Sequence, residues 1–481
     1  MKVALVHYHL EPGGVTRVLE NTVQSWKNSG KGPDQWVILS GRPYTGKILD
    51  HVRVVEGLDY ATLTDSIDPK TLRLRMEDAT RDALGQLPDL WHVHNHSLGK
   101  NPALTQAIAQ LAKEESPMLL QPHDFAEDGR PGNFLNLGKS HERAYPTGGQ
   151  IHYAALNRRD QSFLQYVLKD HPSSVHLLAN AVPSVTPSDL VKTRRTSNSG
   201  IPDNLYLYPV RAVRRKNLGE LALLAASHPE IHFANSLGPT NPSFQSTYED
   251  WKEFGKSLGL SLTYGLGEQT NESFPELVQQ AASIINVSVA EGFGLGFLEP
   301  WSFGKSLCGR NIPDITSDFT QLGVNLENLY SNLWVERSLL DEEYLRNKIK
   351  AALVSIYRQY QVTLPADSFK RAYDAICQGE RIEFGCLDEA MQKLIIQKVK
   401  TSQQLGSSLR EQAELNILTR EEIIRNQNSV RENFSTSVYG IRVQQIYQKI
   451  IDSKQTTIDF ADGQKMLEQF LSPERLNLLR A

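Results

Sequence analysis

The sequence predicts an α/β protein with two tandem Rossmann-like domains and a helical C-terminal extension. Two separate series of strand-like apolar runs alternate with segments of helical periodicity, and a stretch rich in Pro, Ser and Thr lies between them. The chain has 481 residues, which is too many for one hydrophobic core. Alternating strands and helices are typical of parallel sheets that helices cover on both faces.

The first series starts with an apolar strand at residues 2–8, which the turn Pro12-Gly13-Gly14 ends. A helix is expected directly after this turn because apolar residues recur there at helical spacing, and another is expected at 102–114. Further strands of this series are predicted at 35–39, 90–95, 118–123, 151–156 and 175–178. They define a first domain at 1–190 and a linker at 191–203.

The second series predicts strands at 205–210, 231–234, 262–264 and 284–289. We therefore place a second domain at 204–425, with a mostly helical elaboration that begins near residue 340. The last helices, at 426–481, form a separate segment. One interpretation is that this segment returns to the first domain and packs against it.

Composition excludes several classes of protein. The formal net charge of -4 argues against a nucleic-acid binder, which usually needs a strongly basic face. The three cysteines are widely spaced and indicate neither a disulfide framework nor a CxxC metal site, so a reducing cytoplasm is the expected location. No apolar run approaches ~18 residues, so a membrane-spanning helix is not expected, and residues 2–8 are interpreted as a buried strand, not as a signal peptide.

The segment from Ser288 to Pro300 carries the strongest functional signal. Glu291 and Glu299 flank a glycine-rich turn that is expected to follow a strand and to open a helix, so that backbone N–H groups face an anion or a sugar. A separation of roughly two helical turns suits one carboxylate for hexose hydroxyl groups and the other for a ribose diol. The alternative is an ordinary helix N-terminus with an acidic first turn and a surface glutamate.

A basic segment follows the first strand of the second series. Arg211 and Lys216 supply the cations that a nucleoside diphosphate needs, because negative charge gathers on the leaving phosphate. The alternative is a solvated basic loop. In the first domain, Gly13 and Gly14 lack the complete GxGxxG pattern, which disfavours a nicotinamide dehydrogenase.

Histidines cluster at two strand ends of the first domain. His92, His94 and His96 recur with period two, which also allows a metal site, but no nearby carboxylate cluster supports one and no metal is expected. His123 and Asp124 end the next strand at the same sheet edge, where ligands of open α/β folds bind. A satisfied core histidine is the alternative for His123.

The run from Glu291 to Glu299 resembles the E-x7-E signature of retaining GT-B glycosyltransferases of family GT4, and the resemblance extends from the first glycine turn to about residue 322. It implies a GT-B fold, with the two domains facing each other across a cleft, and a retaining hexosyl transfer (EC 2.4). The donor would be a UDP-, GDP- or ADP-hexose, and the acceptor a hydroxyl of a small soluble sugar or sugar acid. The strand followed by Arg211 and Lys216 is similar to the family pattern G-R-x4-K, although Val210 replaces the glycine.

The resemblance also implies the site residues. Catalytic roles fall to His123, Glu291, Arg211 and Lys216. Donor contacts fall to Gly13, Gly14, Arg211, Lys216, Gly265, Phe293, Gly294, Leu295 and Glu299, and acceptor contacts to Asn95, His96 and Asp124. No cofactor or metal is required if the two cations stabilise the leaving group. Residues 310–314 depart from the family pattern and are a candidate for subgroup-specific recognition.

Two other functions remain open at this stage. One is a catalytically inactive sugar-nucleotide-binding protein, and the other is a membrane-associated glycosyltransferase of glycolipids or polysaccharides. Membrane contact is disfavoured because the helix after Gly14 carries only Arg17 and Lys27 against Glu20.

Overall fold

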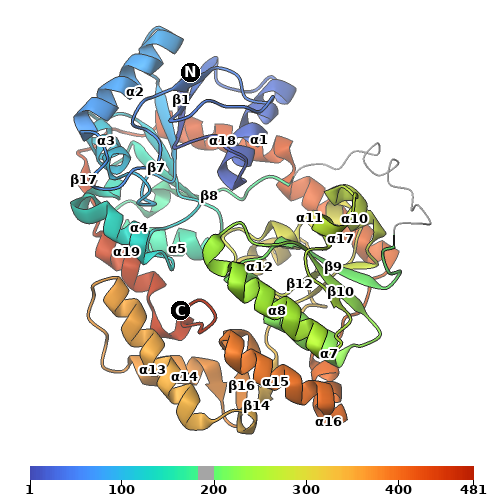
Figure 1. The fold of residues 1–481 in the computed structure, drawn as a ribbon. Coiled ribbons are helices and arrows are strands. Elements are labelled where there is room, and N and C mark those ends of the chain that lie inside the picture. Colours follow the sequence, from blue (N-terminus) through green and yellow to red (C-terminus); the bar gives the residue numbers. More distant parts are fainter. Residues whose placement is uncertain (183–199) are drawn as a thin grey trace. The chain divides into compact units, whose positions relative to one another are not determined.

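The computed structural model describes residues 1–182 and 200–481, and these form two compact units (Figure 1). Unit 1 comprises Met1–Ala181, Gln359–Val362 and Phe434–Ser472, and unit 2 comprises Val182–Arg358, Thr363–Asn433 and Pro473–Ala481. Most of the predicted linker at 191–203 falls on residues 183–199, outside the described residues.

Among the described residues, unit 1 contains a seven-stranded parallel sheet in the order β3-β2-β1-β4-β5-β7-β8. Its strands are β1 (Lys2–His7), β2 (Gln35–Ser40), β3 (Val52–Val54), β4 (Leu90–His94), β5 (Met118–Gln121), β7 (Ile151–Ala155) and β8 (Val175–Leu177). The six strands predicted from apolar runs are confirmed to within two residues at each end. The sequence did not predict β3, because it is a three-residue edge strand with two exposed residues and offers no apolar run.

Helices cover the sheet of unit 1. They are α1 (Gly14–Ser29), α2 (Pro69–Leu84), α3 (Pro102–Lys113), α4 (Pro131–Leu137), α5 (Arg158–Val167), α18 (Thr436–Ile451) and α19 (Gly463–Phe470). The predicted helices after Gly14 and at 102–114 are confirmed. Asn101 begins α3 because its side chain accepts hydrogen bonds from the N–H groups of Ala103 and Leu104, and Pro102 fits the first helical position.

The last helices of unit 1 come from the far end of the chain. Helix α18 packs beside α1, as Figure 1 shows, and shares one buried cluster with it. Helix α19 packs against α5. A two-residue antiparallel pairing of β17 (Asp459–Phe460) with β6 (Pro146–Thr147) also ties this segment to unit 1. The core of unit 1 therefore joins distant parts of the chain: Thr22 of α1 and Tyr439 of α18, whose hydroxyl groups are 3.5 Å apart, are separated by 417 positions.

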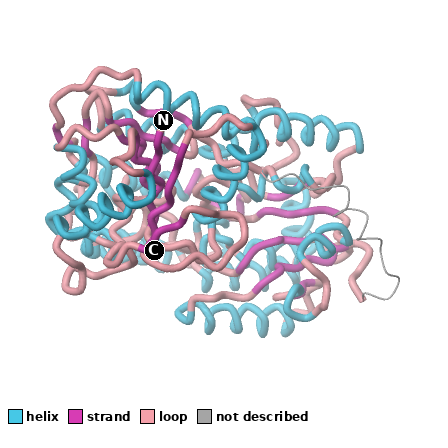
Figure 2. The backbone as a smooth tube through the Cα atoms, turned by 90° about the horizontal axis from the view of Figure 1, so that it is seen from above, coloured by secondary structure: helices cyan, strands magenta, loops and turns pink. Residues whose placement is uncertain are grey.

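In the part of the chain that is described, unit 2 contains a five-stranded parallel sheet in the order β11-β10-β9-β12-β13. Its strands are β9 (Leu205–Arg211), β10 (His232–Leu237), β11 (Leu262–Thr263), β12 (Ser283–Asn286) and β13 (Leu307–Gly309). The four predicted strands exist, but β12 ends three residues earlier than expected. Figure 2 shows the strands as an inner layer with helices on both sides.

The helices of unit 2 continue through its C-terminal part. They are α7 (Leu218–Ser227), α8 (Gln245–Ser257), α9 (Leu266–Gln269), α10 (Phe274–Gln280), α11 (Glu299–Ser302), α12 (Pro313–Thr320), α13 (Glu342–Gln359), α14 (Ser368–Ile376), α15 (Glu389–Thr401), α16 (Gln403–Gln412) and α17 (Arg420–Phe434). The helical character predicted after residue 340 is confirmed. An antiparallel sheet of β14 (Trp334–Glu336), β16 (Arg381–Glu383) and β15 (Cys377–Gln378) was not predicted, because its strands have only two or three residues. No helix in the described residues is both long and apolar enough to cross a membrane.

Candidate active site

The strand order of unit 2 defines a switch point between β9 and β12. From β9 the chain first adds β10 and β11 on one side, and then β12 and β13 on the other. Open α/β sheets bind ligands at such a point, beyond the carboxyl ends of the strands. The segments after β9 and β12 are tied together there, since the N–H of Val289 donates to the carbonyl of Arg215 at 3.0 Å. The hydroxyls of Tyr208 and Ser288 are 2.5 Å apart.

Two of the predicted site residues meet at this switch point. Lys216 ends a short 3-10 turn (η3, Arg214–Lys216) that follows β9, and its Nζ forms an ion pair with Oε1 of Glu291, which follows β12. The two side chains are only 15% and 12% exposed. A partly buried cation and a carboxylate that lie side by side can hold a phosphate and a hydroxyl group at adjacent positions.

Arg211, the last residue of β9, lies beside the adjoining strand. Its Nη1 donates to the carbonyl of Gly238 at 3.2 Å, directly after β10. The N–H of Gly238 in turn donates to Oε1 of Glu268 at 2.8 Å. The structure thus brings Lys216 and Glu291 into contact and holds Arg211 at the same sheet edge, towards β10.

The glycine-rich turn differs from the expectation in one respect. The segment after Glu291 does not open a long helix: Leu295–Phe297 forms a 3-10 turn, and Glu299 begins a one-turn helix, α11. This short helix stops because Gly304, just beyond it, adopts a left-handed conformation with φ 66°. The spacing of two full helical turns that was assumed between the two glutamates is therefore wrong.

Glycine is required inside this turn. Gly294 has φ 89°, and a Cβ atom there would come within 2.9 Å of Ile315 Cγ2. The side chain of Phe293 is buried against Phe319, with ring centroids 5.5 Å apart, so only its backbone is available to a ligand. The donor roles of the amides at 293–295 and of Glu299 remain predictions.

Gly265 lies at the same sheet edge but farther from the switch point. It follows β11, two strands away from β9, and adopts a left-handed conformation with φ 70°. Its N–H donates to Oδ1 of Asn235 at 3.1 Å. Its predicted contact with the donor is untested.

Arg310 has a different role from the one expected for the loop 310–314. Its side chain is buried, and its guanidinium binds the carboxylates of Glu220 and Glu383, each with a shortest distance of 2.6 Å. The interpretation of Arg310 as a recognition residue is wrong, because these buried carboxylates occupy its charged group. Asp314 is exposed and pairs with Arg475 at 3.3 Å.

Sequence reasoning gave no role to Asn217 and Glu220, which follow Lys216 in the chain. The pattern Asn-x-x-Glu resembles a capping box and was the available signal. The structure uses the pattern differently, since Nδ2 of Asn217 donates to Oε2 of Glu220 at 2.7 Å.

In unit 1 the corresponding switch point lies between β1 and β4, and histidines surround it. Nδ1 of His94 and Nε2 of His123 are 2.8 Å apart, and the two rings are stacked. Burial, with the nearby His7 and His92, lowers the pKa of His123 to about 3. Burial likewise holds the pKa of His94 well below its ordinary value. Both rings are therefore neutral near pH 7, and His123 can act there as a hydrogen-bonding group but not as a cation.

The loop after β4 binds the loop after β5. Asn95 has φ 57°, and its Oδ1 accepts hydrogen bonds from the N–H groups of His123 at 2.6 Å and Asp124 at 3.1 Å. His96 is fully buried, with Nε2 2.8 Å from the carbonyl oxygen of Ala144. A direct contact of the His96 ring with an acceptor would require it to leave this position. Asp124 pairs with Arg130 and is partly exposed. The acceptor roles of Asn95, His96 and Asp124 remain predictions.

The first glycine turn leaves open space. Gly13 is extended (φ -178°) and precedes α1 as its N-cap, while an added Cβ at Gly14 would meet no described atom within 4 Å. This leaves room for a ligand at the start of a 16-residue helix, which is a suitable place for an anion. The predicted donor contact of both glycines stays a prediction.

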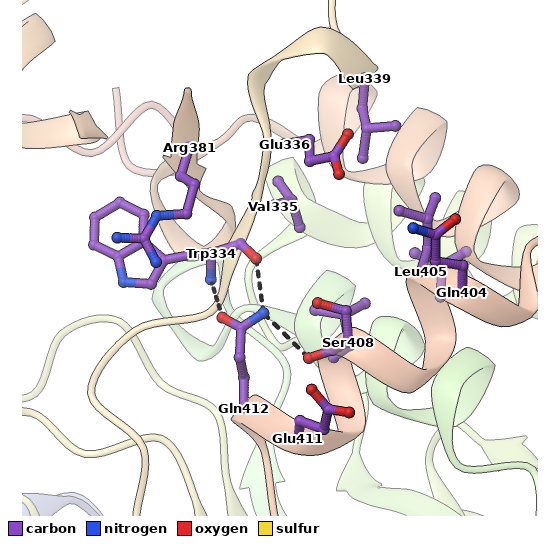
Figure 3. Close-up of a pocket in the computed structure, with 12 residues that line it drawn as sticks. Trp334, Val335, Glu336, Leu339, Arg381, Gln404, Leu405, Ser408, Glu411 and Gln412 are labelled. Atoms are coloured by element: carbon purple, nitrogen blue, oxygen red, sulfur yellow. Dashed lines mark hydrogen bonds between the residues drawn. The ribbon is translucent and has the colours of Figure 1, made fainter. Parts of the chain in front are cut away.

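A separate pocket of about 410 Å³ lies between β14 and α16, and its lining includes no predicted site residue (Figure 3). Gln412 is one of the residues that line this pocket, and its side-chain amide binds the backbone of Trp334. It accepts from the N–H of Trp334 at 2.8 Å and donates to the carbonyl of the same residue at 3.0 Å. These are the two hydrogen bonds that another strand would make, so Gln412 protects the free edge of β14. No group of His, Cys, Asp or Glu among the described residues is arranged to hold a metal ion.

Comparison with known proteins identifies the fold. The chain has the GT-B fold of nucleotide-sugar glycosyltransferases, as its similarity to several solved structures shows. HepE of Anabaena, solved in complex with UDP and glucose, matches with a TM-score of 0.54 and 13% identity over 93% of this chain and 99% of that one. A sucrose-phosphate synthase from Thermosynechococcus elongatus matches with a TM-score of 0.53 and 11% identity over 93% and 98%. The catalytic domain of starch synthase IV from Arabidopsis thaliana, bound to ADP and acarbose, matches with a TM-score of 0.51 and 10% identity over 94% and 99%.

One curated relative is similar in sequence. The mannosylglucosyl-3-phosphoglycerate synthase of Petrotoga mobilis is 28% identical over 344 residues. The match spans 66% of this chain and 66% of the relative, slightly less than two thirds of the relative's length. No protein-family model matches the chain.

Proposed function

We propose that this protein is a retaining glycosyltransferase that transfers a hexose from a nucleoside diphosphate sugar to a hydroxyl group of a small sugar or sugar acid. The observation that carries the proposal is the meeting of Lys216 and Glu291 at the switch point of the unit 2 sheet. The GT-B fold supports the same reaction class. So do the names of the relatives, which include synthases of sugar phosphates and of a glycosylated phosphoglycerate.

In this proposal unit 2 binds the donor. Lys216 and Arg211 stabilise the diphosphate as the bond between the anomeric carbon and the phosphate oxygen breaks, and each charge-assisted hydrogen bond contributes about 1.5–3 kcal/mol. Glu291 is placed at the hexose and Glu299 at the ribose. The acceptor oxygen attacks from the face that the diphosphate leaves, and its proton passes to the leaving phosphate. No metal is required, because the two cations supply the positive charge.

Unit 1 binds the acceptor in this proposal. His123 lies at the carboxyl end of the β5 segment and is neutral, so its ring can hydrogen-bond a hydroxyl group of the transferred sugar without carrying charge. The name of the Petrotoga relative combines mannose, glucose and 3-phosphoglycerate. We therefore place the acceptor among glucosides of phosphoglycerate and similar sugar acids, and a cytoplasmic location agrees with such an acceptor.

The first experiment is a panel of UDP-, GDP- and ADP-hexoses, with and without glucosyl-3-phosphoglycerate, scored by release of the nucleoside diphosphate. NMR of the product then gives the anomeric configuration, and a parallel reaction with EDTA tests the need for a metal. Binding of the released nucleoside diphosphate is measured by calorimetry. Lys216→Met should weaken this binding by roughly 10- to 100-fold, the loss of one charge-assisted hydrogen bond.

Lys252→Met is the matched control, because Lys252 lies on α8 at an exposed position, where it contacts its helical neighbours Glu249 and Tyr248. It should bind like the wild type. Absence of binding to every nucleoside diphosphate, or equal binding by the two lysine variants, would refute the proposed donor site.

A further inference from the structure

A buried network of charged and polar groups includes Asn217, the residue that follows Lys216 in the chain. Glu220, on the first turn of α7, is fully buried, and the side chains of three residues donate hydrogen bonds to it. The guanidinium of Arg310 binds it through Nε at 2.8 Å and Nη2 at 2.6 Å, and the hydroxyl of Tyr330 donates to it at 2.8 Å. Together with Asn217, these two groups fix the orientation of this carboxylate.

Arg310 is in turn fixed to the sheet. Its N–H donates to the carbonyl of Asn286 at 2.6 Å, at the end of β12, and the side chain of Asn286 donates back to the carbonyl of Arg310 at 3.2 Å. Its guanidinium also reaches Glu383, which accepts from the N–H of Leu333 at 3.0 Å. The carboxylate of Glu220 is thus held to the ends of β12 and β13, which border the switch point on the side opposite β10.

Asn217 connects this network to Lys216. It is fully buried and has φ 51° and ψ 55°, a left-handed conformation that a non-glycine residue adopts only when its surroundings hold it there. Its Nδ2 donates to Glu220 at 2.7 Å, and its Oδ1 accepts from Nε2 of Gln392 at 2.9 Å. Its N–H donates to the carbonyl of Arg214 at 2.9 Å and closes the 3-10 turn that carries Lys216.

We propose that Asn217 and Glu220 are positioning residues, which act through the turn of Lys216 to aim its ammonium group at the diphosphate of the donor. This inference rests on the proposed function, because Lys216 is the group that it assigns to the diphosphate. Arg310 acts indirectly. It forms an ion pair with the buried Glu220 and so connects the turn of Lys216 to the ends of β12 and β13. Burial raises the pKa of Glu220, and the neighbouring Arg310 offsets part of that effect.

The test is a double-mutant cycle with Asn217→Gly and Lys216→Met. Glycine adopts the left-handed conformation without strain but lacks the side chain that bonds Glu220 and Gln392. The variant therefore removes these two hydrogen bonds and keeps the backbone conformation. UDP and UMP binding are measured by calorimetry in the wild type, both single variants and the double variant. If the donor panel identifies another base, its diphosphate and monophosphate replace UDP and UMP.

We expect Asn217→Gly to weaken UDP binding by about tenfold, while UMP binding stays within about twofold of the wild type. In the Lys216→Met background the same substitution should change UDP binding by less than about twofold, because its effect passes through the missing ammonium group. A merely structural role would lower both affinities together, in both backgrounds. Equal losses in the two backgrounds, or unchanged UDP binding by Asn217→Gly, would overturn the positioning role.

Two further results keep the inference separate from the proposed function. If the wild type binds no nucleoside diphosphate, the proposed function itself is refuted. If the wild type binds UDP but the losses of the two single variants simply add in the double variant, only the positioning role is refuted. Should Asn217→Gly not fold, Gln392→Met decides, since it removes one of the two bonds to Asn217 and approximately keeps the side-chain volume. A loss of UDP binding of about threefold, with UMP binding unchanged, supports positioning, and unchanged UDP binding overturns it.

Discussion

Acidification from pH 7 to pH 5 is expected to destabilise unit 1, because the middle of its sheet buries neutral histidines. His92 is fully buried between the hydroxyl of Tyr447 at 2.7 Å and Oε1 of Gln121 at 2.8 Å. Burial lowers its pKa from 6.5 to about 4. Between these two values the unfolded chain binds a proton that the folded unit excludes. The free energy of unfolding therefore falls as the pH drops through this window, and it is unaffected above about pH 7.

The size of the effect follows from the two pKa values. Each pH unit inside the window costs up to about 1.4 kcal/mol, so His92 alone should cost about 2 kcal/mol by pH 5. Burial lowers the pKa of His7 and His123 to about 3 and that of His96 to about 4, and these residues add to the loss with the same sign.

Hydrogen exchange followed by mass spectrometry measures the effect locally. Peptides that contain β4 and β5 are compared at pH 7 and pH 5 after correction for the intrinsic exchange rate. In His92→Gln, whose amide can bond both Tyr447 and Gln121, the pH-dependent loss in β4 and β5 should shrink by about 2 kcal/mol. A variant with the same pH dependence as the wild type would refute the reasoning.

Two further predictions concern the fold. Gly309→Ala should destabilise unit 2 by at least about 2 kcal/mol in urea denaturation, because Gly309 has φ 101° and a Cβ would lie 2.2 Å from the carbonyl oxygen of Asn286. The control is Gly406→Ala, which should have little effect because a Cβ there meets no described atom within 4 Å. A chain that ends at residue 433 should lose protection from hydrogen exchange throughout unit 1. Deletion of α18 and α19 removes buried side chains worth about 1.5–3 kcal/mol each, against a typical total stability of about 5–15 kcal/mol; native-like protection in β1 and β4 would contradict this. The losses expected for Lys216→Met and Asn217→Gly complete the series.

Local patterns in the sequence were enough to predict most of the two parallel sheets. A buried parallel strand must be apolar over several residues, so β1, β4 and β9 were visible as apolar runs between turns. The same reasoning missed β3, β13 and β14, each of only three residues. Length alone does not explain these failures, because the equally short β8 was predicted. The same reasoning also overestimated the helix after the glycine-rich turn, which stops after one turn at Glu299–Ser302.

By itself, the sequence determined which residues could carry the chemistry. It placed Lys216 after one strand and Glu291 after another, and a parallel sheet necessarily gathers such ends at one edge. Tertiary structure alone decided which of them touch. Lys216 and Glu291 are 75 positions apart, and Arg310 is 90 positions from Glu220, so neither pairing leaves a local pattern. The physical reason is that periodicity reports only on neighbours along one helix or strand, whereas the burial of Arg310 and the ion pair of Lys216 depend on how strands and helices pack together.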